Sequence, residues 1–288
     1  MTSARTDRAM ALPDTPLALL GLALLLVGLV AISSASIEYA DWNYQDPWFH
    51  TQRHLIYLVL ALAGASFVYR MPTRFWLDTG WVWLFLALAL LILVLIPGIG
   101  REVNGSQRWL PLGPFTLQPS EFAKLAIVVY LAGYMVRREH EVRHEWQGFL
   151  KPMAVLFAAT LLLMIEPDFG ATVIVAGTAF GMLFLAGVKL GHFLIVLLGA
   201  LGAMLVLVVS EPYRVQRLTA YTDPWADPYN TGFQLTQSLI AFGRGEWLGV
   251  GLGNSVQKLF YLPEAHTDFV FAIWAEEMGF VGALMVIA

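Results

Sequence analysis

The 288-residue sequence contains no cysteine and little charge. The absence of cysteine excludes disulfide bonds and thiolate-bound metals. Charged residues make up 13% of the chain, about half of the roughly 25% typical of soluble domains. Hydrophobic residues make up 58%, and the mean hydropathy is +0.66. These values indicate an integral membrane protein. Zinc motifs of the HExxH type and serine-hydrolase triads are also missing from the sequence.

Long apolar stretches between charged residues predict an all-α polytopic membrane bundle with eight spans. A transmembrane helix needs roughly 20 apolar residues. The first stretch is therefore too long for a signal-peptide core, and we expect it to be a retained helix. The last stretch ends within an apolar run, so we expect the natural chain to continue. The eight stretches are residues 17–36, 54–69, 79–100, 125–136, 152–165, 169–188, 190–210 and 269–288.

The distribution of basic residues favours a cytoplasmic N-terminus, because lysine and arginine crowd into short loops on that side. On this topology residues 1–16 form a cytoplasmic tail and residues 17–210 form seven helices with short loops. Residues 211–267 then form a large extracytoplasmic loop, and residues 268–288 form the eighth helix. The amphipathic stretch 231–242 predicts a helix at the membrane interface. Loops this long are more often functional than passive.

Asp268 lies in the run PEAHTDF (263–269), where the long loop re-enters an apolar segment. An ionisable carboxylate at such a boundary is costly to bury, which favours a functional role. Apolar surroundings would raise its proton affinity and suit a general base. The alternative is that Thr267 or Asp268 caps the following helix. His266 and Glu264 flank the aspartate, and Glu264 with Asp268 offers a weak match to the carboxylate pair of glycosidases.

Two further groups of polar residues are candidates for a polar cavity. Glu121 and Lys124 share one helix face at spacing i, i+3, although Glu121 could simply favour the positive end of a helix dipole. Glu276 and Glu277 are adjacent acids inside a span. At least one of them should face the bundle interior, where structural hydrogen bonding is the alternative to a functional role.

Basic residues of the outer loops are candidates for binding a diphosphate, because the guanidinium group matches phosphate oxygens. Solvated loop charges are the alternative for each one. Glycines at 249, 251 and 253 imitate a dinucleotide-binding pattern only loosely, since no strand precedes them. The diphosphate candidates are Arg108, Arg214, Arg217, Arg244 and Lys258, with Gln237 as a further substrate-binding candidate and Arg101 as a lesser one.

Several motifs resemble those of the SEDS family of bacterial cell-wall polymerases. The resemblance covers residues from about 16 to the end and is strongest between 213 and 271. It leans toward the division branch of the family rather than the elongation branch. It implies ten helices in the complete protein, whose closing helices are absent here. The motifs are QPSEF (118–122), FLKPM (149–153), EPDFG (166–170), MLFLAG (182–187) and PEAHTDF (263–269).

The resemblance implies glycosyl transfer on lipid II at the outer face of the bacterial inner membrane, with enrichment at the division septum. Asp268 aligns with the family's essential loop aspartate, and Lys124 and Glu121 align with its fourth-helix polar pair. Glu166 departs from relatives that have glutamine there. Implied partners are lipid II, a class B penicillin-binding transpeptidase and other division proteins, with no nucleic acid. A divalent cation, Mg²⁺ or Mn²⁺, is an open possibility.

Three alternatives remain at this stage. A lipid II transporter would use Glu121, Lys124 and Glu276 as a polar path across the membrane. An elongation-type polymerase would share the chemistry but not the place of action. A scaffold in a division complex would have no chemistry at all.

Overall fold

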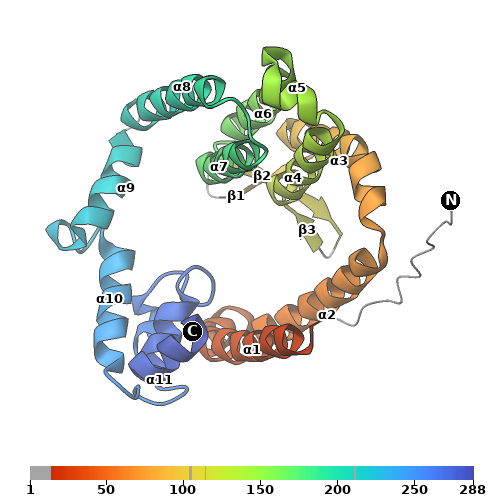
Figure 1. Cartoon of the computed structure of the whole chain (residues 1–288). Coiled ribbons are helices and arrows are strands. Elements are labelled where there is room, and N and C mark those ends of the chain that lie inside the picture. Colours follow the sequence, from red (N-terminus) through yellow and green to blue (C-terminus); the bar gives the residue numbers. More distant parts are fainter. Residues whose placement is uncertain (1–13, 104–105, 114, 211) are drawn as a thin grey trace. The chain divides into compact units, whose positions relative to one another are not determined.

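The computed structural model describes residues 14–103, 106–113, 115–210 and 212–288. The chain forms two compact units, one made of the segments up to Ser66 and from Val208 to Ala288, the other of Phe67–Leu207. Both are mainly helical (Figure 1). Each unit is described below by itself.

The unit Phe67–Leu207 is built around four packed helices. They are α3 (Thr73–Leu95), α4 (Pro119–Arg137), α6 (Trp146–Ile165) and α7 (Phe169–Leu185), joined by the short α5 (Glu139–His144) and followed by α8 (Leu190–Val209). Helices α3 and α4 approach closely at Gly80, where an added Cβ would lie 3.1 Å from the Tyr130 Cα. Interlocking apolar side chains such as Leu91, Leu131 and Leu163 are fully buried between the helices.

A small antiparallel sheet connects α3 to α4, where the sequence predicts only a connection between two spans. It consists of β1 (Arg101–Val103), β2 (Ser106–Leu112) and β3 (Phe115–Leu117) in the order β1-β2-β3. Arg101 pairs with Trp109, and Leu110 pairs with Leu117. Strands β1 and β3 have three residues each, which carry too little alternation to be recognised from sequence.

The other unit combines the first helices with the C-terminal part of the chain. It contains α1 (Thr15–Tyr44), most of α2 (Phe49–Arg70), α9 (Pro212–Thr222), the 3₁₀ turn η1 (Pro224–Ala226), α10 (Phe233–Gly245), the π turn η2 (Gln257–Tyr261) and α11 (Val270–Ile287). Small residues on α1, including Ala31, Ser34 and Ala35, are buried. They let α11 pack beside α1 (Figure 1).

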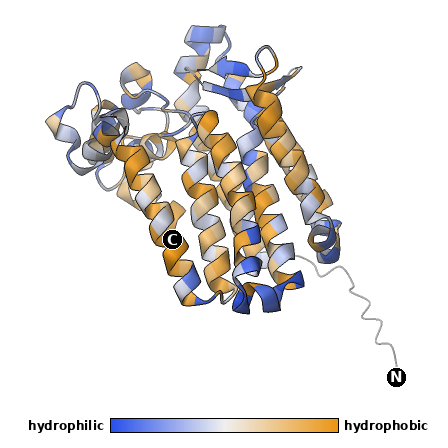
Figure 2. Cartoon of the chain, turned by 90° about the horizontal axis from the view of Figure 1, so that it is seen from above, coloured by the Kyte–Doolittle hydropathy of each residue, from blue (hydrophilic) through white to orange (hydrophobic). Residues whose placement is uncertain are grey.

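The predicted fold class is confirmed. Seven helices in the described part of the chain are long and apolar enough to cross a membrane, and α7 is a shorter apolar helix. These eight helices coincide with the eight predicted stretches. Figure 2 shows apolar residues along the helices and polar residues gathered near their ends. Helix α3 ends at Leu95 rather than at residue 100, because Pro97 disfavours a helical residue before it.

Helix α11 is interrupted at Gly279, which has φ 69° and ψ −172°. The interruption leaves backbone groups free, and the loop after α10 binds them. The amides of Val250 and Gly251 donate to the carbonyls of Glu276 and Glu277, both at 3.0 Å. A Cβ on Gly279 would lie 2.3 Å from the Gly249 nitrogen, so the two backbones cross where only glycine fits. The glycine-rich loop, residues 249–253, is therefore hydrogen-bonded to the backbone of α11 at its interruption.

Candidate active site

Asp268 lies at an open cleft of about 570 Å³ within the unit that holds both chain ends. It is exposed and stands two residues before the start of α11. The opposite wall comes from α10 and the segment before it, with Thr231, Gln234 and Leu235, and from Ala220 and Tyr221 of α9. The cleft thus mixes polar and apolar groups around one carboxylate. Binding sites for small molecules typically occupy roughly 300–1,000 Å³.

Neither Thr267 nor Asp268 caps α11, so the structure does not support that alternative. The N-cap is Phe269, without a side-chain hydrogen bond. The Thr267 hydroxyl donates to Glu264 Oε2 at 2.7 Å instead. Within the described residues the Asp268 carboxylate has no hydrogen bond or ion pair. It is exposed rather than buried, and both oxygens are available to a ligand.

His266 and Glu264 contribute to the shape of this loop. The His266 ring is half-buried and stacks on Tyr39 of α1, with centroids 4.7 Å apart, and lies 4.8 Å from the His50 ring. Burial lowers the pKa of His266, and the nearby Glu264 partly opposes this. A neutral, stacked imidazole fits a packing role. Glu264 is exposed, with φ 56°.

Glu276 and Glu277 are both fully buried, at 0% and 1% exposure, so the expectation that at least one faces the interior is confirmed. Glu277 accepts hydrogen bonds from the Ser34 hydroxyl at 2.7 and 2.8 Å. It also pairs with the Lys258 ammonium, whose Nζ lies 3.0 Å from Oε1. Glu276 accepts from the Ser255 hydroxyl and from the amides of Val256 and Gln257.

The predicted diphosphate ligands are in different environments. The Lys258 side chain is only 4% exposed, so, contrary to the prediction, its ammonium is not available to a diphosphate. Arg244 is 44% exposed and lies 3.5 Å from Glu276 Oε1. Gln237 is half-buried on α10, and Arg101 is exposed on β1. The side chains of Arg214 and Arg217 lie outside the described residues, and their roles stay predictions.

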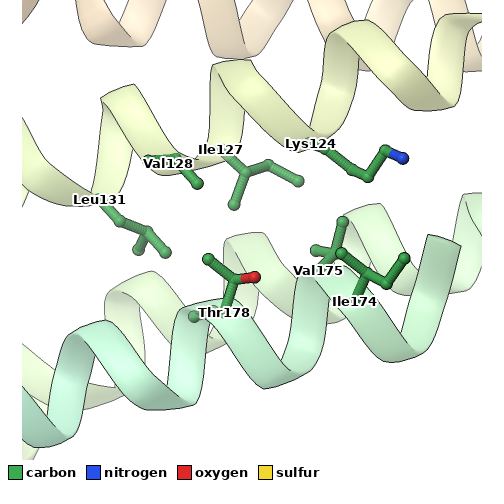
Figure 3. Close-up of a pocket in the computed structure, with 8 residues that line it drawn as sticks. Lys124, Ile127, Val128, Leu131, Ile174, Val175 and Thr178 are labelled. Atoms are coloured by element: carbon green, nitrogen blue, oxygen red, sulfur yellow. The ribbon is translucent and has the colours of Figure 1, made fainter. Parts of the chain in front are cut away.

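Glu121 and Lys124 belong to the unit Phe67–Leu207, and they pair with each other. Lys124 Nζ lies 2.8 Å from Glu121 Oε1, and the side chains are 26% and 61% exposed. Lys124 stands at the end of a small apolar pocket of about 50 Å³ between α4 and α7 (Figure 3). Residues such as Leu131 and Thr178 line its other end. The pair therefore places one cation at the mouth of an apolar groove.

The sequence predicts no role for Glu166, yet its environment is unusual. It is fully buried, and neither carboxyl oxygen has a hydrogen-bond partner among the described residues. Burial raises its pKa to about 8; Asp168 adds to the effect and Arg108 opposes it. Arg108 donates to the backbone carbonyls of Glu166 and Pro167, which ties β2 to the α6–α7 connection. Arg108 thus has a structural role here; its role toward diphosphate stays a prediction.

No group of three or more histidine or acidic side chains in the described ranges is arranged to hold a metal ion. A cation held jointly by a carboxylate and substrate phosphates would need no such cluster, because Mg²⁺ usually keeps only one or two protein carboxylates. Asp268 is the acid in the cleft that fits this pattern.

These features define a class: a polytopic α-helical membrane protein with an aspartate, unpaired among the described residues, in a cleft lined mainly by α9 and α10. The family model described as "Cell cycle protein", which covers FtsW, RodA and SpoVE, matches residues 15–288. The chain belongs to this family, the SEDS family, and the resemblance seen in the motifs is confirmed.

Curated relatives extend over nearly all of the chain. It is 58% identical over 280 residues to the probable peptidoglycan glycosyltransferase FtsW of Nitrosococcus halophilus, covering 96% of this chain and 72% of that protein. The identity to the protein of the same name from Pseudomonas fluorescens is 55% over 275 residues, covering 96% and 68%. The protein of that name from Hahella chejuensis is 52% identical over 287 residues, covering 100% and 72%.

Two solved structures share the fold. One comes from a peptidoglycan synthase complex described as coordinating polymerization and crosslinking, with a TM-score of 0.71 and 28% identity, covering 95% of this chain and 74% of that one. The other is the rod shape determining protein RodA of Thermus thermophilus, with a TM-score of 0.64 and 26% identity, covering 95% and 70%.

Proposed function

We propose that the protein is a peptidoglycan glycosyltransferase that polymerises lipid II at the outer face of the cytoplasmic membrane during septal wall synthesis. The relatives named above carry this activity in their names and match 96–100% of the chain. The observation that carries the proposal is the Asp268 carboxylate, exposed in a cleft and without a partner among the residues that the structure describes.

Asp268 would act as the general base. It takes the proton from the 4-hydroxyl of the incoming GlcNAc while that oxygen attacks the anomeric carbon of the MurNAc at the end of the growing glycan. The bond to undecaprenyl diphosphate breaks, and the diphosphate leaves with the electron pair. A positioned base of this kind contributes typically ~10²–10⁴-fold to the rate. The cleft, about 570 Å³, offers room for sugar rings beside the carboxylate.

The leaving diphosphate needs positive charge near it, because charge develops on its oxygens in the transition state. Arg244 retains partial exposure and belongs to the same unit as Asp268. We propose Arg244 as the most suitable of the predicted diphosphate-binding cations; a role for Lys124 stays a prediction. A divalent cation, Mg²⁺ or Mn²⁺, that would help to neutralise the leaving diphosphate stays a prediction. A class B penicillin-binding transpeptidase as partner is supported by the synthase-complex relative.

The transporter alternative is less well supported. It requires Glu276 to line a path for ions or lipid. Glu276 is fully buried, and its oxygens accept bonds from Ser255, Val256 and Gln257, so no oxygen remains open to a travelling ligand.

The test is a polymerisation assay on fluorescent lipid II with the complete protein, co-purified with its transpeptidase partner. We expect Asp268→Asn to abolish the glycan ladder while lipid II binding stays close to wild type, because the base is lost and the cleft is kept. Asp41→Asn is the matched control, since Asp41 is exposed at the end of α1 and does not line the cleft.

An unchanged ladder from Asp268→Asn would overturn the role of this residue. Ladders in no sample, together with lipid II crossing the bilayer of proteoliposomes, would favour the transporter.

A further inference from the structure

We propose that Lys258 and Glu277 are positioning residues for Asp268, acting through a buried charge network that fixes α10 and the glycine-rich loop against α11. This inference rests on the proposed polymerase function and adds two residues that the chemical step itself does not use.

The network starts from one buried ion pair. Lys258 Nζ lies 3.0 Å from Glu277 Oε1 and 3.2 Å from the Ser34 hydroxyl, which in turn donates to Glu277. The side chains of Lys258 and Glu277 are 4% and 1% exposed. Three separate segments, namely α1, the turn η2 and α11, therefore meet at one pair of charges.

Glu276 extends the network to α10. Its carboxylate binds the Ser255 hydroxyl and the next two backbone amides, and the Arg244 guanidinium of α10 lies 3.5 Å away. A Cβ on Gly245 would lie 2.1 Å from the Ala275 carbonyl oxygen. Helix α10 therefore packs on α11 with backbone contact beside these charges.

The same elements frame the cleft. Thr231, Gln234 and Leu235 on one wall belong to α10 or lead into it, and Asp268 on the other wall leads into α11. The turn η2 continues into Leu262 and Ala265, which are buried against Ala272 and Ile273 of α11. The chain that carries Asp268 is thus anchored at both ends, at η2 by Lys258 and at α11 by the two glutamates.

A buried ion pair is a poor source of net stability, because removing both charges is often neutral, whereas removing one leaves the other unpaired and is strongly destabilising. We attribute a geometric role to this pair at the junction of three segments: it sets the register of α1 and η2 on α11, and Glu276 with Arg244 sets that of α10. A small displacement of a catalytic group has a large effect on rate, on the order of 100-fold for about 1 Å.

The experiment compares Lys258→Met, Glu277→Gln and the double variant in the complete protein with its partner. We expect each single variant to lower the melting temperature. The double variant should regain most of the wild-type melting temperature, since no charge is left unpaired. Its kcat for lipid II polymerisation should stay on the order of 10- to 100-fold low, with a KM within a few-fold of wild type, because substrate binding is kept and the base is misplaced.

The matched control is Lys151→Met with Glu141→Gln. This pair, with 3.3 Å between Nζ and Oε2, makes the same kind of contact in the other unit, with side chains that are 54% and 24% exposed. Its loss should leave kcat unchanged. A double variant at 258 and 277 that regains both melting temperature and kcat would overturn the inference, because the pair would then serve stability alone. Failure of the wild type to polymerise lipid II would instead overturn the proposed function.

Discussion

Buried acids in this protein have two different environments. Glu276 and Glu277 are surrounded by hydroxyl, amide and cationic donors, which compensate for the loss of hydration. Glu166 has no donor to its carboxyl oxygens in the part of the chain that the structure describes. Its charged form is therefore disfavoured, and burial raises its pKa to about 8. At neutral pH the protonated carboxyl resembles a glutamine side chain, the residue that the family resemblance implies for some relatives at this position.

This environment predicts a pH dependence of stability. An unfolded chain releases the Glu166 proton near its ordinary pKa of 4.5, whereas the folded protein keeps it up to about 8. Between these values the folded state binds more protons, so stability falls as the pH rises through this window and then levels off. Glu166→Gln removes the titration. The melting temperature of this variant relative to wild type should rise from about pH 5 to about pH 8 and stay constant above.

Thermal unfolding in detergent across this range measures the effect. Glu102→Gln, which removes an exposed acid on β1, controls for the loss of one charge. A difference between Glu166→Gln and wild type that is independent of pH would contradict the buried, protonated state.

Among the secondary-structure elements, α11 has the strictest backbone requirements, at its junction with the glycine-rich loop. Phe280 and Val281 donate to the carbonyls of Glu246 and Trp247 at 2.9 and 3.1 Å, so the groups released by the break are satisfied within the protein. Such satisfaction is required at membrane depth. The conformation of Gly279 is one that side-chain-bearing residues almost never adopt.

We therefore expect Gly279→Ala to destabilise the protein by at least about 1–3 kcal/mol from backbone strain, with a further cost from the contact with Gly249. Gly202→Ala on α8, where an added Cβ meets nothing within 4 Å, should be neutral or slightly stabilising. Chemical or thermal unfolding of the two variants in detergent measures the difference. Equal melting temperatures would show that α11 can continue as an unbroken helix.

The elements differ in how well the sequence predicted them. The apolar stretches could be predicted because a membrane-spanning helix is identified by its own length and hydropathy alone. The amphipathic stretch 231–242 became α10, Phe233–Gly245, for the same reason. The strands around Trp109 and the break at Gly279 were not predicted, since both depend on pairing with distant segments.

For the whole molecule, the membrane topology is the main remaining prediction. A cytoplasmic N-terminus places Arg74 at the inner surface and residues 211–267 outside. These 288 residues contain no cysteine, so a cysteine introduced into them has no competing thiol in this part of the chain. We expect Tyr229→Cys to react with a membrane-impermeant maleimide in intact spheroplasts, and Arg74→Cys to react only after lysis. Tyr229 is 85% exposed and the Arg74 side chain 90%, so exposure does not limit either site. The reverse pattern would overturn the orientation.

The sequence by itself determined the class, the eight apolar helices and the family, because hydropathy and local motifs are properties of short segments. It also singled out Asp268. Only the tertiary structure decided that Lys258 is buried against Glu277. It also decided that, within the described ranges, Asp268 stands unpaired at a cleft and the Glu166 carboxyl has no partner. These facts depend on contacts between residues up to 243 positions apart, such as Ser34 with Glu277. Only the folded chain determines that the Asp268 carboxylate faces solvent while the Glu277 carboxylate faces the Lys258 ammonium.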